Sequence, residues 1–301
     1  MTVRIGLDVG GTFTDIVMID PRKGLKASKK VRSTPTDPSD AILNGVKLIL
    51  DEHGVQSNEV VFFGHGTTVV TNMIVERKGA KIALLTTSGF RDVLELARQS
   101  RPSVYDYSVS RPKPIVDRRN RFEIAERVSS GGEVLTNPNK TQLDQLVSTL
   151  RQQEFEAVAV CFINSYRNPS NEKRVSDFLR AVMPNAYVSS SSEVAPEFRE
   201  YERFSTTALN AFVGPHSSKY FMNLSKFLTE MDIPARTYTV TSNAGLISVD
   251  DACSMPIRTS LSGPAAGVAG IGKMLGDSQN DGIITFDVGG TSTDISLVGA
   301  T

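Results

Sequence analysis

The sequence has no tryptophan, few cysteines and no excess of either charge. Its two cysteines, Cys161 and Cys253, stand far apart without the spacing of a metal site, and Cys161 lies in an apolar run that predicts buried packing. Lysine plus arginine equal aspartate plus glutamate, 33 against 33, so no overall field favours nucleic acid or a membrane surface. No apolar stretch approaches the length of a membrane span. We therefore expect neither nucleic-acid nor membrane partners.

Several familiar motifs are also missing. The chain contains no GxxxxGKS or GxxxxGKT loop and no GxGxxG after a strand, so P-loop and dinucleotide-binding folds have little support. Neither a Gly-x-Ser-x-Gly elbow nor a zinc-binding helix occurs. The first residues enter a strand that carries Asp8, which is not the pattern of a signal peptide. Cytoplasmic localisation is the default expectation.

The chain is organised around a nine-residue stretch that occurs twice. DVGGTFTDI spans residues 8–16 and DVGGTSTDI spans residues 287–295, and the copies differ only at Phe13 and Ser292. Each copy follows an apolar run and leads into another. This pattern predicts a β-hairpin whose turn is Gly-Gly-Thr.

A turn of this composition suits an anion. Glycine permits positive φ and close approach of a ligand to the backbone, and the freed N–H groups, with the hydroxyls of Thr12 and Thr14, form an anion nest. Asp8, at the strand end, could hold Mg²⁺ through water or orient an attacking group. One such hairpin is equally consistent with a simple tight turn. Two copies indicate two similar lobes that offer phosphate loops to one cleft, an arrangement that resembles the superfamily of acetate and sugar kinases, heat-shock ATPases and actin.

The predicted fold is α/β: an actin-like (ribonuclease H-like) nucleotide-binding lobe with an inserted βαβ segment and the opening hairpin of a second lobe. Three strands followed by a helix over residues 41–53 match the opening of such a lobe. A polar break near residues 189–192 predicts domains over residues 3–190 and 196–301. Separate helices are expected to begin near Pro196 and to span residues 217–231.

Two further segments are candidates for ligand binding. A predicted strand ends at Gly64-His65-Gly66-Thr67-Thr68, and small hydroxyl residues at that end of a strand are where α/β proteins bind ligands. For His65 itself, a satisfied structural histidine is favoured over a ligand contact. Ser262 and Gly263 precede a small-residue helix, whose N-terminus suits an anion. Close helix packing is the competing explanation for that helix.

Six segments in a fixed order resemble the hydantoinase/oxoprolinase family. They are DVGGTFTD, HGTTVVTN with ERKGA, GFRDVLELARQSRPSVYDY, SSEVAPEFREYERFSTT with NAFVGP, SGPAAGV and DVGGTSTD. Each segment alone is a weak signal, whereas the ordered set is specific and covers nearly the whole chain. The chain is similar to the ATP-using subunits of N-methylhydantoinase and of acetone or acetophenone carboxylase, and to the matching half of 5-oxoprolinase. Ala266 stands where the family has a more glycine-rich element.

The resemblance implies ATP-dependent hydrolysis of a cyclic amide of the hydantoin or 5-oxoproline type, in which ATP phosphorylates the amide oxygen. A second, B-type subunit or domain would complete the reaction, and an oligomer is expected. By the same resemblance Asp8, Asp287 and His65 are catalytic, and Asp8 and Asp287 organise Mg²⁺. The residues expected to contact ATP are Gly10, Gly11, Thr12, Thr14, Gly66, Thr67, Thr68, Ser262, Gly263, Gly289, Gly290 and Thr291.

Two other functions stay open on the sequence. The chain could be the ATP-using subunit of a ketone carboxylase, because the partner subunit carries the distinguishing chemistry. It could also be a non-enzymatic actin-like nucleotide switch, which explains the two hairpins but not the other motifs. Since Thr301 follows directly on the second hairpin, we expect the chain to be part of a longer protein and the isolated 301 residues to be inactive.

Overall fold

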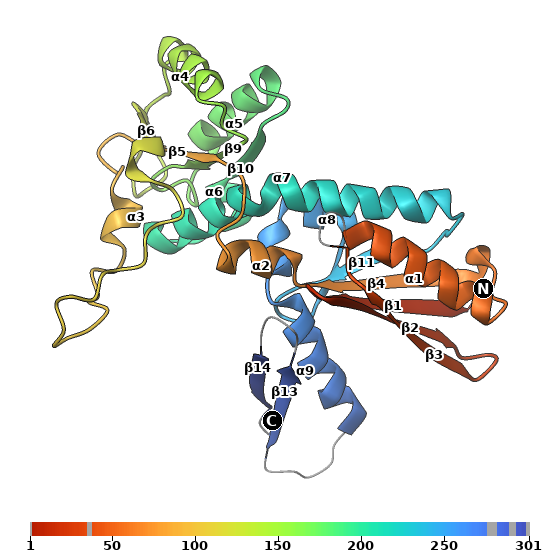
Figure 1. Cartoon of the computed structure of the whole chain (residues 1–301). Helices are drawn as coiled ribbons and strands as arrows, with labels where there is room; N and C mark the ends of the chain where they lie inside the picture. The colour runs from red at the N-terminus through yellow and green to blue at the C-terminus, as the bar shows by residue number, and fades with distance from the viewer. Residues whose placement is uncertain (1, 35–37, 276–281, 289–292, 299–301) are drawn as a thin grey trace. The chain divides into compact units, whose positions relative to one another are not determined.

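The structure, a computed structural model, describes residues 2–34, 38–275, 282–288 and 293–298 (Figure 1). The chain forms two compact units. Unit 1 comprises residues 1–76 and 217–301, and unit 2 comprises residues 77–216. Unit 2 is therefore inserted between the two segments of the chain that form unit 1.

Unit 1 is built on a mixed sheet. In the described part of the chain the sheet has six strands in the order β12-β11-β4-β1-β2-β3. Their bounds are β1 (Val3–Val9), β2 (Phe13–Asp20), β3 (Leu25–Arg32), β4 (Val60–Thr67), β11 (Arg236–Val240) and β12 (Leu246–Ser248). Strand β4 is parallel to β1 and to β11, and the other neighbours are antiparallel. The carboxyl ends of β1, β4 and β11 consequently meet at one edge of the sheet, where α/β proteins bind ligands.

Strand β1 buries one of its two faces. Its residues alternate strictly, so that Val3, Ile5, Leu7 and Val9 are buried while Asp8 and the other residues between them are exposed. Helix α1 (Pro38–Glu52) and the C-terminal part of α7 (Glu200–Glu230) complete the core on the buried face. The helical core residues are Ile42, Val46, Ile49, Leu50, Tyr220, Phe221, Leu224 and Leu228.

The remaining elements of unit 1 are helices, 3₁₀ turns and a second hairpin. Helix α9 (Ser262–Leu275) lies on the opposite side of the sheet from α1 (Figure 1). The others are the 3₁₀ turns η1 (Ser57–Glu59) and η3 (Pro256–Thr259), the helices α2 (Val69–Val75) and α8 (Val249–Ser254), and the paired strands β13 (Ile283–Val288) and β14 (Thr293–Val298).

Unit 2 contains a parallel sheet with its own core. In the described residues its four strands follow the order β10-β9-β5-β6. The strands are β5 (Ile82–Thr87), β6 (Arg121–Ile124), β9 (Ala157–Cys161) and β10 (Tyr187–Ser190), with a small antiparallel pair, β7 (Arg127–Val128) and β8 (Val134–Thr136). The helices are α3 (Val93–Leu96), η2 (Arg118–Asn120), α4 (Lys140–Gln152), α5 (Ser170–Val182) and α6 (Ser191–Val194). Every residue of β5 and β9 is buried, Cys161 included, as expected for central strands of a parallel sheet.

A buried carboxylate anchors the loops that follow β9 and β10 in unit 2. Glu172 has no exposed surface, and its oxygens accept hydrogen bonds from the amide of Phe162 (2.9 Å) and from the hydroxyl of Ser191 (2.7 Å). Arg203 is also buried and donates to the Phe162 carbonyl (3.0 Å) and to the Ser191 hydroxyl (3.2 Å). Because buried charges need such partners, these contacts fix the loops together.

Helix α7 corrects the prediction of two separate helices. A single helix runs from Glu200 to Glu230 with Pro215 in its interior. Proline removes one backbone hydrogen bond and normally ends a helix. Here the segment before it buries Phe212 in unit 2, and the segment after it buries Phe221 in unit 1. Apolar burial of this extent, about 1.5–3 kcal/mol for each large side chain, offsets the lost bond.

One helix and one domain boundary expected from the sequence can be compared directly with the structure. The helix expected over residues 41–53 is present as α1, with small shifts at its ends. Helix α3 has only four residues, because Ala97 takes a positive φ of 49° and ends it. The predicted break near residues 189–192 lies inside unit 2. No helix among the described residues combines the length and the apolar character that crossing a bilayer requires.

Candidate functional site

The first glycine turn is held in place by the end of β3. The amide of Gly10 donates to the Phe13 carbonyl (3.0 Å), and Ser33 donates from its amide to Thr12 (3.0 Å) and from its hydroxyl to the Gly10 carbonyl (2.8 Å). A Cβ on Gly10 would lie 3.1 Å from the Phe13 oxygen, so the turn favours glycine at this position. The Gly-Gly-Thr hairpin predicted from the sequence is confirmed.

Two backbone N–H groups of this turn are available to bind a ligand. No hydrogen bond among the described residues uses the N–H groups of Gly11 and Thr12, which is the condition for an anion nest. Thr14 is placed differently, because its side chain is buried and its hydroxyl shares a hydrogen bond with Ser33 (3.0 Å). The structure therefore shows Thr14 bracing the turn, and its contact with ATP stays a prediction.

The end of β4 is tied to β1 and to the start of α9. Thr68 donates to the Val9 carbonyl from both its amide (3.1 Å) and its hydroxyl (3.2 Å). The Ser262 hydroxyl accepts from the Thr67 amide (3.2 Å) and donates to the Thr67 carbonyl (2.9 Å). Leu261, with a φ of 56°, donates its amide to the Thr71 hydroxyl (2.8 Å). Three segments that are distant in sequence are thereby fastened at one edge of the sheet.

Asp8 lies where these three segments meet. A Cβ on Gly263 would be 3.4 Å from Asp8 Oδ1, and a Cβ on Gly66 would be 3.5 Å from the same oxygen. Both glycines leave the space beside the carboxylate open. The predicted site residues Asp8, Gly66 and Gly263 are thus brought together.

The charge around Asp8 is predominantly negative. Asp8 keeps solvent access at the sheet edge, but partial desolvation by the surrounding protein raises its pKa, and the like charges of Asp287 and Asp15 raise the pKa further. Lys30 opposes this shift, although it also pairs with Asp15 at 3.1 Å. A cation placed here would relieve the repulsion between the carboxylates.

The second hairpin repeats the register of the first. Asp287 pairs with Asp294 across β13 and β14, just as Asp8 pairs with Asp15 across β1 and β2. A hollow of about 190 Å³ lies between this hairpin and α9, and Asp287, Asp294 and Gly267 are among the residues that line it. Gly289, Gly290 and Thr291 lie outside the described residues.

His65 lies away from Asp8. The sheet register pairs His65 with Leu7, a core residue, and its imidazole contacts Tyr220 and Phe221 of α7. The Nε2 atom lies 2.5 Å from the Tyr220 hydroxyl. Burial lowers the pKa of His65 to about 3, so the ring is neutral. The structure does not bring His65 together with Asp8, and its catalytic role stays a prediction.

The carboxylates at this edge fit a magnesium ion that a nucleotide brings with it. The described residues contain no cluster of three or more His, Cys, Asp or Glu side chains suited to a metal held by protein alone. Mg²⁺ in nucleotide sites is usually held by one or two carboxylates together with phosphate oxygens and water. Asp8 and Asp287 would supply those carboxylates.

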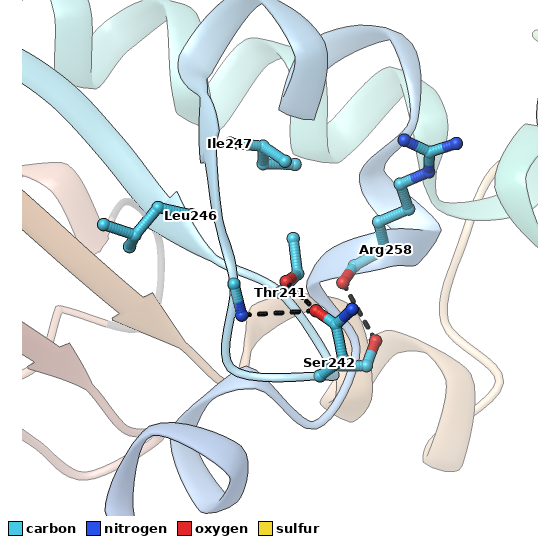
Figure 2. Close-up of a pocket in the computed structure, with 7 residues that line it drawn as sticks. Thr241, Ser242, Leu246, Ile247 and Arg258 are labelled. Atoms are coloured by element: carbon cyan, nitrogen blue, oxygen red, sulfur yellow. Dashed lines mark hydrogen bonds between the residues drawn. The ribbon is translucent and has the colours of Figure 1, made fainter. Parts of the chain in front are cut away.

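One pocket at the same edge was missed by the sequence analysis. It has a volume of about 460 Å³ and is lined by the turn after β11, the start of β12 and Arg258 (Figure 2). The sequence carries a signal for it, because Thr241, Ser242 and Asn243 are small polar residues directly after β11. Thr67 and Thr68 carry the same signal, small polar residues at the carboxyl end of a strand.

The sheet architecture, together with the residues at the carboxyl ends of β1, β4 and β11, is that of proteins with an α/β nucleotide-binding fold. The predicted fold class is confirmed by solved structures that share the fold. The chain belongs to the hydantoinase/oxoprolinase family. Residues 4–183 match the hydantoinase/oxoprolinase N-terminal region, and residues 203–301 match the hydantoinase/oxoprolinase domain.

Three relatives show how far the similarity extends. Caprolactamase subunit alpha of Pseudomonas jessenii is 33% identical over 300 residues, covering 98% of this chain and 43% of the relative, and the crystal structure of the ATP-dependent caprolactamase superposes with a TM-score of 0.84. The nucleotide-free structure of acetone carboxylase, an ATP-dependent enzyme, has a TM-score of 0.87 at 25% identity over 99% of this chain and 44% of that one. The 5-oxoprolinase of Saccharomyces cerevisiae is 29% identical over 337 residues, 99% of this chain and 26% of the enzyme. The chain thus spans less than half the length of these relatives.

Proposed function

We propose that this chain is the ATP-using part of an ATP-dependent hydrolase that opens a cyclic amide of the lactam or hydantoin type. A B-type partner subunit or domain would complete the reaction, in line with the subunit named in the caprolactamase relative. Cytoplasmic localisation and an oligomeric state stay predictions.

One observation carries this proposal. Three segments bring Asp8, the open amides of Gly11 and Thr12, and the glycine-lined space at Gly66 and Gly263 to the carboxyl ends of parallel strands. Open amides favour a phosphate, and a carboxylate beside them favours the metal ion that accompanies it. The 33% sequence identity to the ATP-dependent caprolactamase over 98% of this chain supports the same assignment.

Phosphorylation of an amide oxygen by ATP requires no covalent bond between the protein and the substrate. An amide is a poor electrophile, and transfer of the γ-phosphoryl group of ATP to its oxygen releases ADP and turns that oxygen into part of a phosphate leaving group. Water can then add to the carbon, and the C–N bond breaks as the nitrogen takes up a proton, so that the ring opens to an acyl phosphate. A second water hydrolyses this acyl phosphate to a carboxylate and inorganic phosphate. The chain's task is to position the phosphates and offset their charge. The turn amides would hold the phosphates, with Thr67 and Thr68 shaping the adjoining wall.

A magnesium ion would supply charge neutralisation at the phosphates, and Asp8 and Asp287 would hold it. His65 enters the proposal as a positioning residue. Its neutral imidazole bonds to Tyr220 and holds β4 against α7, so it acts through the backbone of Gly66 and Thr67.

The test measures ADP formation by the full-length protein with its partner, with and without a lactam or a hydantoin. ADP formation should depend on one of these rings, and Asp8→Asn should lower it at least about tenfold, in line with the loss of one charge-assisted contact. Asp51→Asn, an exposed carboxyl change on α1, should leave it unchanged. Turnover with neither class of ring, or full activity in Asp8→Asn, would reject the proposal.

A ketone carboxylase is the second candidate, favoured by the fold shared with acetone carboxylase. In that case labelled bicarbonate should be incorporated into a ketone in an ATP-dependent manner, and ADP formation should not respond to cyclic amides.

A further inference from the structure

Unit 2 has an exposed arm between α3 and β6. The arm comprises residues 98–117, which the structure describes throughout and which contain no helix or strand. It reaches away from the sheet of unit 2 (Figure 1). Segments of this length without secondary structure are uncommon in compact domains, and those that occur usually carry a function or are disordered. The hydrogen bonds along the arm distinguish these two cases.

The base of the arm is fastened to the rest of unit 2. Near its start, the Arg98 guanidinium pairs with the carboxylate of Glu202 on α7. Near its end, the Arg77 guanidinium donates to the Lys113 carbonyl (2.7 Å). Both ends of the arm are therefore fixed.

The tip of the arm has hydrogen bonds of its own. The Asp106 amide donates to the Ser103 hydroxyl (3.1 Å), and the Asp106 carboxylate accepts from the amide (2.9 Å) and the hydroxyl (2.6 Å) of Ser108. The bonds from Ser108 lower the pKa of Asp106, so its carboxylate is charged at neutral pH. The Arg101 guanidinium lies over the Tyr107 ring, 5.1 Å from its centroid, and donates to its hydroxyl (3.3 Å). The tip is thus an ordered structure.

This ordered tip exposes large apolar side chains to solvent. Tyr105 is 92% exposed and Tyr107 is 82% exposed, and Val104 and Val109 are exposed beside them. The Tyr105 side chain has no hydrogen bond, ion pair or ring contact among the described residues. A single exposed apolar side chain is ordinary, whereas a group of them on a fixed projection marks an interaction surface. Tyrosine and arginine are also the residues that interfaces favour.

The arm carries an excess of positive charge. Its basic residues are Arg98, Arg101, Arg111 and Lys113, and its acidic residues are Asp106 and Asp117. Of the basic side chains, Arg101, Arg111 and Lys113 form no ion pair with any residue that the structure describes. A surface that complements the arm therefore combines an apolar hollow with carboxylates.

A second copy of the arm does not offer that surface. A two-fold contact brings the same side chains of both subunits together, so two arms would place unpaired cations against unpaired cations. Like charges opposed across an interface are costly. The charge of the arm therefore favours a different protein as its occupant.

We propose that the arm docks the B-type partner subunit, and that this subunit meets it with an apolar hollow bordered by aspartate and glutamate side chains. Tyr105 fills the hollow, the Arg101–Tyr107 pair packs against its edge, and Lys113 faces the carboxylates. Because the arm is ordered before it binds, docking costs less conformational entropy than binding by a disordered loop. The inference rests on the proposed function, which supplies the partner.

The first experiment measures binding of the full-length protein to its separately purified B-type partner subunit by surface plasmon resonance. Tyr105→Ala should weaken binding at least about tenfold, as expected for an aromatic side chain at the centre of an interface. Tyr105→Phe keeps the ring and should bind about as tightly as the unchanged protein. Leu135→Ala changes an exposed apolar side chain on β8. It is the matched control and should not alter binding.

The second experiment tests the charge of the arm. Lys113→Gln should slow association with the partner by about two- to fivefold at low ionic strength, because charges at the rim of an interface act mainly on the association rate. The difference should vanish at high salt, where exposed charges are screened. Lys140→Gln, an exposed change on α4, is the matched control and should associate at the unchanged rate.

Three results would overturn the inference: undiminished partner binding by Tyr105→Ala, an equal weakening by Leu135→Ala, or self-association of the full-length protein alone that Tyr105→Ala abolishes. ADP formation with a cyclic amide, recorded on the same samples, reports on the proposed function separately. Partner binding that depends on Tyr105, without ring-dependent ADP formation, would reject the function and keep the docking arm. Ring-dependent ADP formation with partner binding independent of Tyr105 would keep the function and reject the docking arm.

Discussion

The buried side chain of His65 allows a direct test of how the core of unit 1 is packed. The His65 side chain has no exposed surface, its Nε2 forms a hydrogen bond with the Tyr220 hydroxyl, and its Nδ1 has no hydrogen-bond partner among the described residues. Aromatic rings of Tyr220 and Phe221 surround it. A charged imidazole would be costly in this position, and burial accordingly lowers the pKa of His65 to about 3.

The direction of the pH effect follows from this shift. In the unfolded chain His65 has its ordinary pKa of about 6.5. Because the folded pKa is lower, the stabilisation is fully present above pH 6.5 and is lost as the pH falls from 6.5 towards 3. Between pH 7 and pH 5 the unfolded state gains a proton that the folded state does not, and linkage gives a loss of about 2 kcal/mol in the free energy of unfolding.

Hydrogen exchange of β1 and β4 amides, followed by mass spectrometry at pH 7 and pH 5, would measure this loss in unit 1 without interference from unit 2. His65→Gln should remove the loss of about 2 kcal/mol in the free energy of unfolding between pH 7 and pH 5. His53→Gln, an exposed change after α1, should retain this loss. If His65→Gln kept the full acid sensitivity, the assignment of a buried neutral imidazole would be wrong. Tyr220→Phe keeps the histidine and should keep the acid sensitivity, which separates titration from a general loss of packing.

Two further predictions concern unit 1, one at the proposed site and one in the core. Ser262→Ala removes the hydroxyl that bonds both the amide and the carbonyl of Thr67, so it should lower the free energy of unfolding by about 1–3 kcal/mol and weaken binding of an ATP analogue, as measured by urea unfolding and fluorescence titration. Gly45→Ala places a Cβ 2.2 Å from Ile16 Cδ1 in the core and should cost about 1–3 kcal/mol by overpacking; Gly6→Ala, where nothing lies within 4 Å, should leave the melting temperature nearly unchanged.

The hairpins and most helices were predictable because their signals are local. The Gly-Gly-Thr turn, the alternation of Val3, Ile5 and Leu7, and the helical spacing of Ile42, Val46 and Ile49 can all be recognised in short windows. Helix α7 was not predictable in the same way. Its two segments bury different side chains in different units, so no single apolar stripe continues across Pro215.

The site was predicted in part for a related reason. Strand ends with small hydroxyl residues indicated where Thr67 and Thr68 lie, but not which face of β4 each neighbour occupies. His65 and Gly66 are adjacent in sequence, and successive side chains on a strand point to opposite faces. The sheet register places His65 beside Leu7 and Gly66 beside Asp8, and that register depends on pairing between distant strands rather than on the local sequence.

The repeated register of the two hairpins bears on how a nucleotide could bind. Each hairpin pairs two aspartates across its strands, Asp8 with Asp15 and Asp287 with Asp294, and Asp287 is near enough to raise the pKa of Asp8. Lys30 is the only basic group among the described residues that lowers the pKa of Asp8. Bringing a polyphosphate to these carboxylates alone would add like charge to a site that already repels it. Under the proposed function, ATP binding must therefore be coupled to a divalent cation, and removing that cation should abolish nucleotide binding rather than slow the later chemistry alone.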